Sequence, residues 1–150
     1  MISQLVRICT VILTGMIAGT LWCIWFGFNP KTLSLTSYLE QQQNLIKSFN
    51  VLMPALGLVA IIFTLITAFI NKERKSVLFS LLVAAICLIC SGLVTRFGNQ
   101  PINAVVITWT PEHFPENWTD VRDKWWLLHI IRSVTSFVAF LLVVQSEIRK

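Results

Sequence analysis

Four long apolar stretches separated by more polar segments dominate the pattern of this chain. They cover about residues 5–28, 51–70, 77–95 and 125–144. A bilayer core about 30 Å thick takes about 20 apolar residues per helix. Backbone polar groups in lipid must be satisfied within the segment, so each stretch is expected to be a helix. The pattern predicts an all-α fold, a membrane-spanning four-helix bundle that forms a single domain over residues 1–150.

The connecting segments differ in length and charge. The turn 71–76 is short and basic, whereas the loops 29–50 and 96–124 are long and carry few net charges. Further basic residues lie near the two chain ends: Arg7, Arg149 and Lys150. Short cytoplasmic loops of membrane proteins carry an excess of Lys and Arg. We therefore expect both termini and the short turn in the cytoplasm and the two long loops outside. The first stretch lacks a small-residue cleavage site, which favours a retained span over a signal peptide.

The two long loops are expected to differ in structure. Residues 36–49 alternate apolar and polar positions at helical spacing, which predicts a short amphipathic helix on the membrane surface or capping the bundle. The second loop contains Pro101, Pro111 and Pro115, so much of it is expected to be non-helical. Pro101 should kink or end the third span nearby.

Composition narrows the function classes. Hydrophobic residues make up 55% of the 150 residues and charged residues 13%, about half the charged share of a typical soluble domain. This excludes a disordered chain. The net charge of +5 is scattered over the ends of apolar segments, which argues against a nucleic-acid partner. The expected partners are the lipid bilayer of a bacterial inner (plasma) membrane, a lipophilic small molecule and, in a homo-oligomer, further copies of the chain.

The fourth stretch carries the most polar chemistry. One helical face holds residues spaced 3, 4, 3 and 4 apart: Arg122, Trp125, His129, Arg132 and Ser136. Arg132 lies roughly 10 Å below Trp125 along the axis, at a depth where facing lipid would be costly. We therefore expect Arg132 and His129 to face the bundle interior or a wet cavity.

Two asparagines are expected at the same depth. Asn99 and Asn103 are four residues apart at the outer end of the third span, level with His129. Intramembrane ionisable residues are candidates for a functional site, although a purely structural polar pair would use the same residue types. Trp109 and Trp118 in the outer loop either line an aromatic pocket or anchor the chain at the interface.

Cysteines and histidines offer weaker alternatives. Cys87 and Cys90 have the C-x-x-C spacing of a redox-active dithiol, as in membrane thiol–quinone oxidoreductases. They lie in the middle of an apolar span, where a reactive thiolate is disfavoured, so packing is the expected role. His113 and His129 are the only histidines and show no metal-ligand spacing, so neither a metal nor a cofactor is expected.

A longer motif points to a family. It runs through Asn99-x-Pro101-x-Asn103, Trp109 and Trp118-x-x-x-Arg122-x-x-Trp125-x-x-x-His129-x-x-Arg132. The motif resembles the anthrone-oxygenase-like family of small four-helix membrane proteins. In fungal members the implied activity is the cofactor-free oxidation of an anthrone to an anthraquinone, whereas many bacterial members have no assigned substrate.

The resemblance implies a division of roles among these residues. His129 would remove a proton from an acidic methylene, and Arg132 would hold the resulting oxyanion. Asn99 and Asn103 would orient the carbonyl or the peroxide. The substrate-binding residues would be Trp109, Trp118, Arg122 and Trp125, with the indole rings sandwiching a flat substrate. Two alternatives remain: a non-catalytic protein that binds a quinone, lipid or small amphiphile at this site, and a thiol–quinone oxidoreductase using Cys87 and Cys90.

Overall fold

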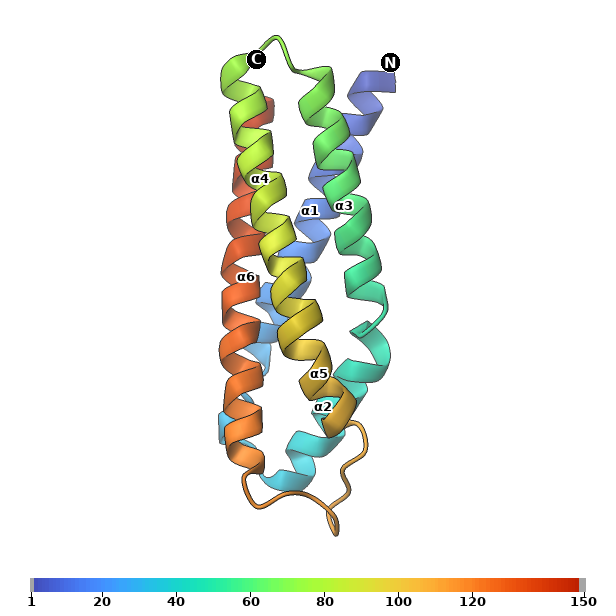
Figure 1. The fold of residues 1–150 in the computed structure, drawn as a ribbon, viewed down its shortest axis with the longest axis vertical. Coiled ribbons are helices and arrows are strands. Elements are labelled where there is room, and N and C mark those ends of the chain that lie inside the picture. The colour runs from blue at the N-terminus through green and yellow to red at the C-terminus, as the bar shows by residue number, and fades with distance from the viewer. Residues whose placement is uncertain (1, 149–150) are drawn as a thin grey trace.

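Four long helices run side by side through the computed structural model, which describes residues 2–148 (Figure 1). They are α1 (Ile2–Gly27), α3 (Leu52–Ile70), α4 (Lys75–Val94) and α6 (Trp118–Ile148). All four are long and apolar enough to cross a membrane. The prediction of an all-α, membrane-spanning four-helix bundle is confirmed.

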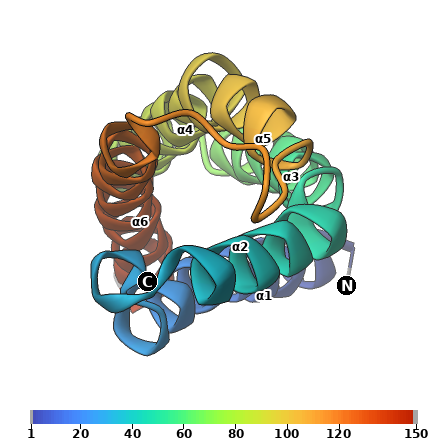
Figure 2. The ribbon, with the colours of Figure 1, turned by 90° about the horizontal axis from the view of Figure 1, so that it is seen from below.

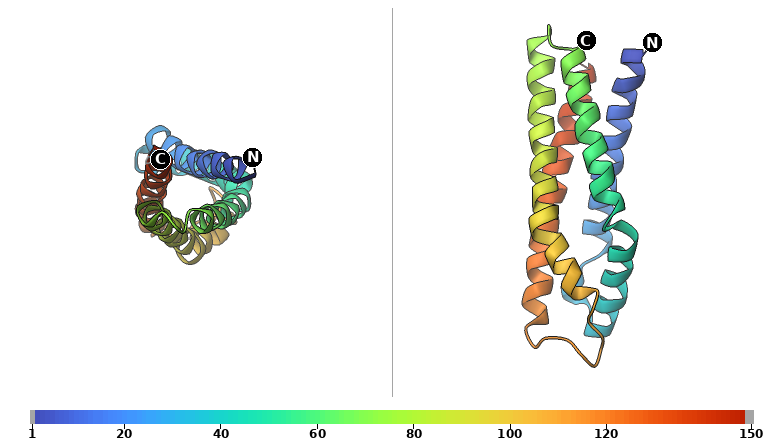
Figure 3. Two further views of the ribbon diagram at one scale, coloured as in Figure 1. Left: turned by 90° about the horizontal axis from the view of Figure 1, so that it is seen from above. Right: turned by 45° about the vertical axis from the view of Figure 1, so that its right-hand side comes forward.

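The four helices close into a ring. α1 packs against α3 and α6, and α4 packs against the same two helices from the other side, as the end-on views show (Figures 2 and 3). Large apolar side chains cover the outside of the ring; among them, Phe69 is 72% exposed and Phe79 70% exposed. An apolar outer surface of this extent suits hydrocarbon rather than water.

One half of the bundle carries both ends of the described chain and the turn between α3 and α4, and we call it the terminal half (Figure 1). Its core is closed by small side chains, including the fully buried Ala60, Ala84 and Ala139, which allow close helix contact. Both ends lie on one side of the bundle, as expected from their basic residues. Arg149 and Lys150 lie outside the described residues, and the side of the membrane that this half faces stays a prediction.

The opposite half, from the middle of the bundle to the end covered by the long connections, is called the cap half. The short 3₁₀ turn η1 (Pro30–Thr32) leads into α2 (Leu35–Phe49), whose first turn is capped by the Ser34 hydroxyl accepting from the backbone N–H of Ser37. α2 lies across the end of the bundle (Figure 2). It buries Tyr38 and Ile46 in an aromatic cluster, and burial raises the pKa of Tyr38. The expected amphipathic helix is present and caps the bundle.

The third span is longer than expected. After α4 the chain forms a π-helical turn, η2 (Thr95–Asn99), and then α5 (Gln100–Val106). The Gln100 N–H donates to the Thr95 carbonyl, five residues back, so the wider turn continues the helix into Pro101, which has no N–H to donate. The expectation of a largely non-helical loop from residue 96 is therefore wrong for 96–106. It holds for 107–117, between α5 and α6.

Glycine permits this wider turn to lie close to α6. A Cβ atom added to Gly98 would lie 2.9 Å from a methyl group of Leu128. The π-turn and the first half of α6 therefore lie closer together than a side chain at position 98 would allow. This approach positions Asn99 and Asn103 against α6.

Candidate functional site

The centre of the site is the predicted pair on α6. Arg132 donates from Nε (3.3 Å) and Nη2 (2.9 Å) to Nδ1 of His129. The other ring nitrogen, Nε2, lies 3.1 Å from the Leu21 carbonyl of α1. A guanidinium only donates and a carbonyl only accepts, so Nδ1 carries the lone pair and Nε2 the proton. His129 is therefore held as a neutral imidazole that supports Arg132.

The predicted asparagines also converge on α6. Asn103 accepts from Nε1 of Trp125 (2.8 Å) and donates to Oδ1 of Asn50 (2.9 Å), while Asn99 donates to the Trp125 carbonyl (3.1 Å). The Trp125 ring stacks on the His129 ring at a centroid distance of 5.2 Å. The structure thus joins Asn99, Asn103, Trp125, His129 and Arg132 in one continuous network.

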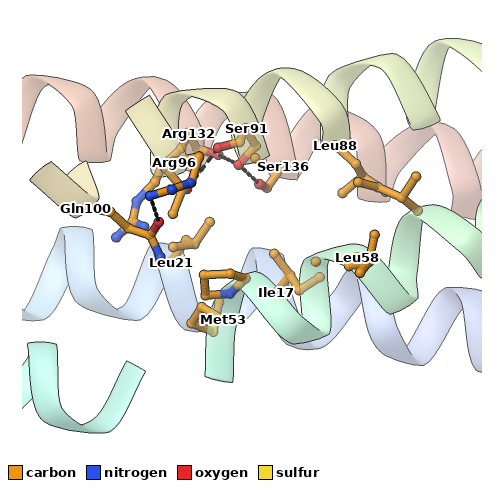
Figure 4. Close-up of a pocket in the computed structure, with 15 residues that line it drawn as sticks. Ile17, Leu21, Met53, Leu58, Leu88, Ser91, Arg96, Gln100, Arg132 and Ser136 are labelled. Carbon is orange, nitrogen blue, oxygen red and sulfur yellow. Dashed lines mark hydrogen bonds between the residues drawn. The ribbon is translucent and has the colours of Figure 1, made fainter. Parts of the chain in front are cut away.

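A cavity of about 220 Å³ lies inside the bundle beside Arg132. Figure 4 shows that Arg96, Gln100 and Arg132 gather at one end of it, whereas Leu58 and Leu88 lie at the other. The volume falls just below the range of about 300–1,000 Å³ typical of small-molecule sites. The cavity can take a slender apolar body with one polar end.

A second, smaller cavity of about 30 Å³ lies on the α2 side of Arg132. Its lining residues include Arg132, Asn103, Trp125 and Gln42. Gln42 is fully buried, and neither its amide oxygen nor its amide nitrogen has a hydrogen-bond partner among the residues that the structure describes. Such a group calls for a water molecule or a polar group of a ligand, and the cavity is large enough for one water molecule.

The two arginines of the larger cavity lack counter-ions. The ion pairs of the described residues join Arg7 to Glu147 and place Asp123 between Lys31 and Arg122; none includes Arg96 or Arg132. Arg96 bonds the Gln100 side chain (3.3 Å). A guanidinium without a carboxylate beside an apolar space is suited to bind an oxyanion.

Sequence reasoning missed Gln42, Arg96 and Gln100. The spacing of Arg96 and Gln100, four residues apart, signals a shared helical face only once the helix is known to continue through Pro101. Gln42 carries no such signal, because it is one of several consecutive polar residues on an amphipathic helix.

Three predicted substrate-binding residues line neither cavity. Trp109 is buried in the aromatic cluster of the cap, where its carbonyl accepts from the Gln43 side chain (2.9 Å). Trp118 packs against Tyr38 and carries the Arg122 guanidinium 5.0 Å above its ring. These residues attach the loop and α2 to the end of the bundle. Of the three predicted aromatic residues, Trp125 alone lines one of these two cavities.

His129 also lines neither cavity and is fully buried. The Arg132 guanidinium occupies its lone pair. A proton can pass to Nδ1 of His129 only after this hydrogen bond opens. The role of His129 as a base stays a prediction, and it requires that Arg132 first release the ring.

The two cysteines of the C-x-x-C sequence are free thiols that line neither cavity. Cys90 is exposed on the outer surface of α4 and Cys87 is partly buried. Their position favours packing at a lipid-facing surface over electron transfer at the Arg132 site.

Comparison with known proteins agrees with the geometry. The family model described as anthrone oxygenase matches residues 43–142. The chain belongs to the anthrone oxygenase family. The part matched to the anthrone oxygenase model extends from α2 to the second half of α6 and so contains Asn99, Asn103, His129 and Arg132. Comparisons with curated proteins and with solved structures give no match.

Proposed function

We propose that this chain is a membrane oxygenase that oxidises an activated methylene group of a lipophilic aromatic ketone to a carbonyl. One dioxygen molecule is consumed, one of its oxygen atoms enters the product and the other leaves as water. The observation that carries the proposal is Arg132, a guanidinium that has no counter-ion among residues 2–148 and lines an apolar cavity inside the bundle. We further propose that the membrane is a bacterial inner (plasma) membrane with both termini cytoplasmic.

The first step exchanges the partner of Arg132. The substrate carbonyl replaces Nδ1 of His129 as acceptor for the guanidinium, and this frees the Nδ1 lone pair. Movement of Arg132 also opens the way from the cavity to the imidazole, so that a water molecule can carry a proton from the methylene to His129, and the electron pair moves toward the carbonyl oxygen as an enolate. Arg132 stabilises the developing oxyanion by charge-assisted hydrogen bonds. Binding of substrate and activation of the base are thereby coupled through one side chain.

The second step uses the electron-rich carbanion form of the substrate. It reduces dioxygen, a carbon–oxygen bond forms, and protonation gives a hydroperoxide. Loss of water from this hydroperoxide breaks the O–O bond and leaves the carbonyl. Asn103 and Gln42 line the smaller cavity on the other side of Arg132, where they can bind the distal peroxide oxygen or the released water. Asn99 positions the α6 backbone at Trp125.

The test is oxygen uptake by the purified protein in lipid nanodiscs supplied with 1,8-dihydroxyanthrone. Quinone formation and oxygen uptake should be equal, after subtraction of the spontaneous oxidation seen in empty nanodiscs. Arg132→Met should lower the rate by about 100-fold or more, as removal of an oxyanion donor does elsewhere. The control is Lys47→Met, which removes an exposed cation from the same half of the bundle without touching a cavity. Equal rates in Arg132→Met and wild type would contradict the proposal.

A histidine variant separates the base from the arginine. His129→Ala should abolish turnover while the protein still inserts and still binds the anthraquinone product, because Arg132 keeps its place at the cavity. Full activity in His129→Ala would remove the imidazole from the mechanism and leave Arg132 as the working group.

A second candidate is a binding protein that holds a quinone, lipid or small amphiphile at the same site without chemistry. The complete enclosure of His129 favours it, since a ligand clamp needs no accessible base. This candidate predicts saturable ligand binding with no oxygen uptake above the empty-nanodisc rate.

A further inference from the structure

The larger cavity opens sideways between α3 and α4. Its lining residues from α1 and α6 are buried or partly buried, whereas the exposed members, Leu58, Gly92 and Arg96, all belong to α3, α4 and the π-turn that follows. A Cβ atom added to Gly57 or Gly92 would meet no atom within 4 Å. Both helices lie within the candidate spans. The opening therefore faces lipid, not the aqueous loops.

The opening and the interior of this cavity each present a guanidinium. Arg96 is exposed at the mouth, and Arg132 lies deeper on α6 (Figure 4). The hydrogen-bond acceptors of their side chains are neutral: the Gln100 amide and the His129 ring. Two cations at membrane depth without a carboxylate are costly unless a ligand supplies the negative charge.

The rest of the lining has the opposite character. From Arg132 toward the middle of the bundle the walls are formed by Ile17, Leu58, Ile61 and Leu88, with the hydroxyls of Ser91 and Ser136 bonded to each other (2.9 Å). This end has no free polar group for a second charged or hydrated end of a ligand. A ligand that satisfies both ends has one anionic head and one apolar body.

We propose that the cavity binds an amphiphilic anion drawn sideways from the bilayer, with its ionised oxygen head bridging Arg96 and Arg132. The chemical class is a lipophilic carboxylate or a group of the same shape and charge, with an apolar body of fused rings or an acyl segment. The inference goes beyond the proposed oxygenase and rests on it for the role of the site: the anionic head takes the place at Arg132 that the enolate oxygen has in that proposal, so the anion competes with the ketone substrate. The binding itself does not depend on turnover.

The experiment compares two ligands that differ in charge and little else, 2-naphthoate and 2-naphthamide. Their binding is measured with radiolabelled compounds on wild-type protein in phosphatidylcholine nanodiscs under argon. The affinity ratio of the anion to the amide should fall by about tenfold in Arg96→Gln and by at least as much in Arg132→Gln, since a charge-assisted hydrogen bond from a guanidinium is stronger to the anion than to the neutral amide. Comparing ratios removes the unequal partitioning of the two compounds into lipid.

Matched variants control for general effects of charge and shape. Lys47→Gln removes an exposed cation from α2 and should leave the ratio unchanged. Gly57→Leu should slow the association of both ligands by obstructing the mouth, whereas Gly19→Leu should not. Like Gly57, Gly19 has no atom within 4 Å of an added Cβ; it is exposed and lies on α1 away from the cavity lining.

Two sources of the anionic head are distinguished by adding phosphatidylglycerol to the nanodiscs. Competition with naphthoate identifies an anionic lipid headgroup as the occupant, and its absence identifies a small lipophilic acid; either result supports an anion site. A ratio that is the same in wild type and both arginine variants overturns the inference. Naphthoate preference without anthrone oxidation would sustain the anion site while refuting the oxygenase.

Discussion

The terminal half and the cap half of the bundle treat their polar groups in opposite ways. In the terminal half, Thr10 and Thr67 bond each other at 2.8 Å, and Arg7 pairs with Glu147 at 2.6 Å. In the cap half, the Gln42 side chain has no hydrogen-bond partner within the described part of the chain, and the partner of the Arg132 side chain there is the neutral His129 ring. The same contrast holds for space, because the terminal half is closed by alanines whereas the cap half contains both cavities.

This difference separates scaffold from site. Buried polar groups are normally satisfied, and an unsatisfied one has a cost that packing elsewhere must offset. Close packing of small residues in the terminal half provides that stability. The cap half, with its capping helix and π-turn, leaves donors and acceptors available for a ligand.

The largest expected effect tests the contrast in packing. Ala139→Leu adds three carbon atoms to a fully buried position of the terminal half and should lower the free energy of unfolding by about 1–3 kcal/mol. Gly92→Leu adds an even larger group at the mouth of the cap cavity, where an added Cβ has open space. It should leave stability unchanged or raise it by up to about 1 kcal/mol, since leucine favours helix over glycine.

Thermal unfolding in one detergent, followed by tryptophan fluorescence, measures both variants. Equal destabilisation by the two substitutions would show that the cap half is as tightly filled as the terminal half. The assignment of the cavity as a ligand space would then fail.

A smaller effect, opposite in sign between the halves, tests the contrast in polarity. Thr10→Val removes a hydroxyl that bonds Thr67 and the carbonyls of Val6 and Phe63, and should cost about 1 kcal/mol. Gln42→Leu removes two buried polar atoms without partners and should stabilise the empty protein by about 1 kcal/mol. The same Gln42 variant should lower the rate of anthrone oxidation. A destabilised Gln42→Leu protein would indicate that the amide is already satisfied.

Much of the fold followed from hydropathy, because the bilayer sets a length for each helix and forbids unsatisfied backbone. The extent of the third helix did not. Pro101 is normally a reason to end a helix, and the π-turn that accommodates it lies in close contact with Leu128 of the neighbouring helix α6, where Gly98 has no side chain. A contact of that kind is tertiary and leaves no periodic signal in the sequence.

The candidate site was predictable in part for the same reason. From helical spacing and the cost of a charge in lipid we predicted that His129 and Arg132 face the bundle interior, near the two asparagines. The structure places both side chains there. Which group faces open space depends on rotamers and on the neighbouring helices. The sequence therefore could not show that Arg132 lines the cavity while His129 lies behind it, nor that Trp109 and Trp118 serve the cap.

The smallest expected effect concerns the cysteine pair, which belongs to neither side of the contrast. Replacing Cys87 and Cys90 together by alanine should change stability by no more than about 0.5 kcal/mol, since Cys90 is exposed and Cys87 only partly buried. Anthrone oxidation and naphthoate binding should stay at wild-type levels, because neither thiol lines a cavity. Loss of quinone-linked activity in this double variant, with Arg132→Met still active, would move the working site to the outer surface of α4 and favour the thiol–quinone chemistry over oxygenation.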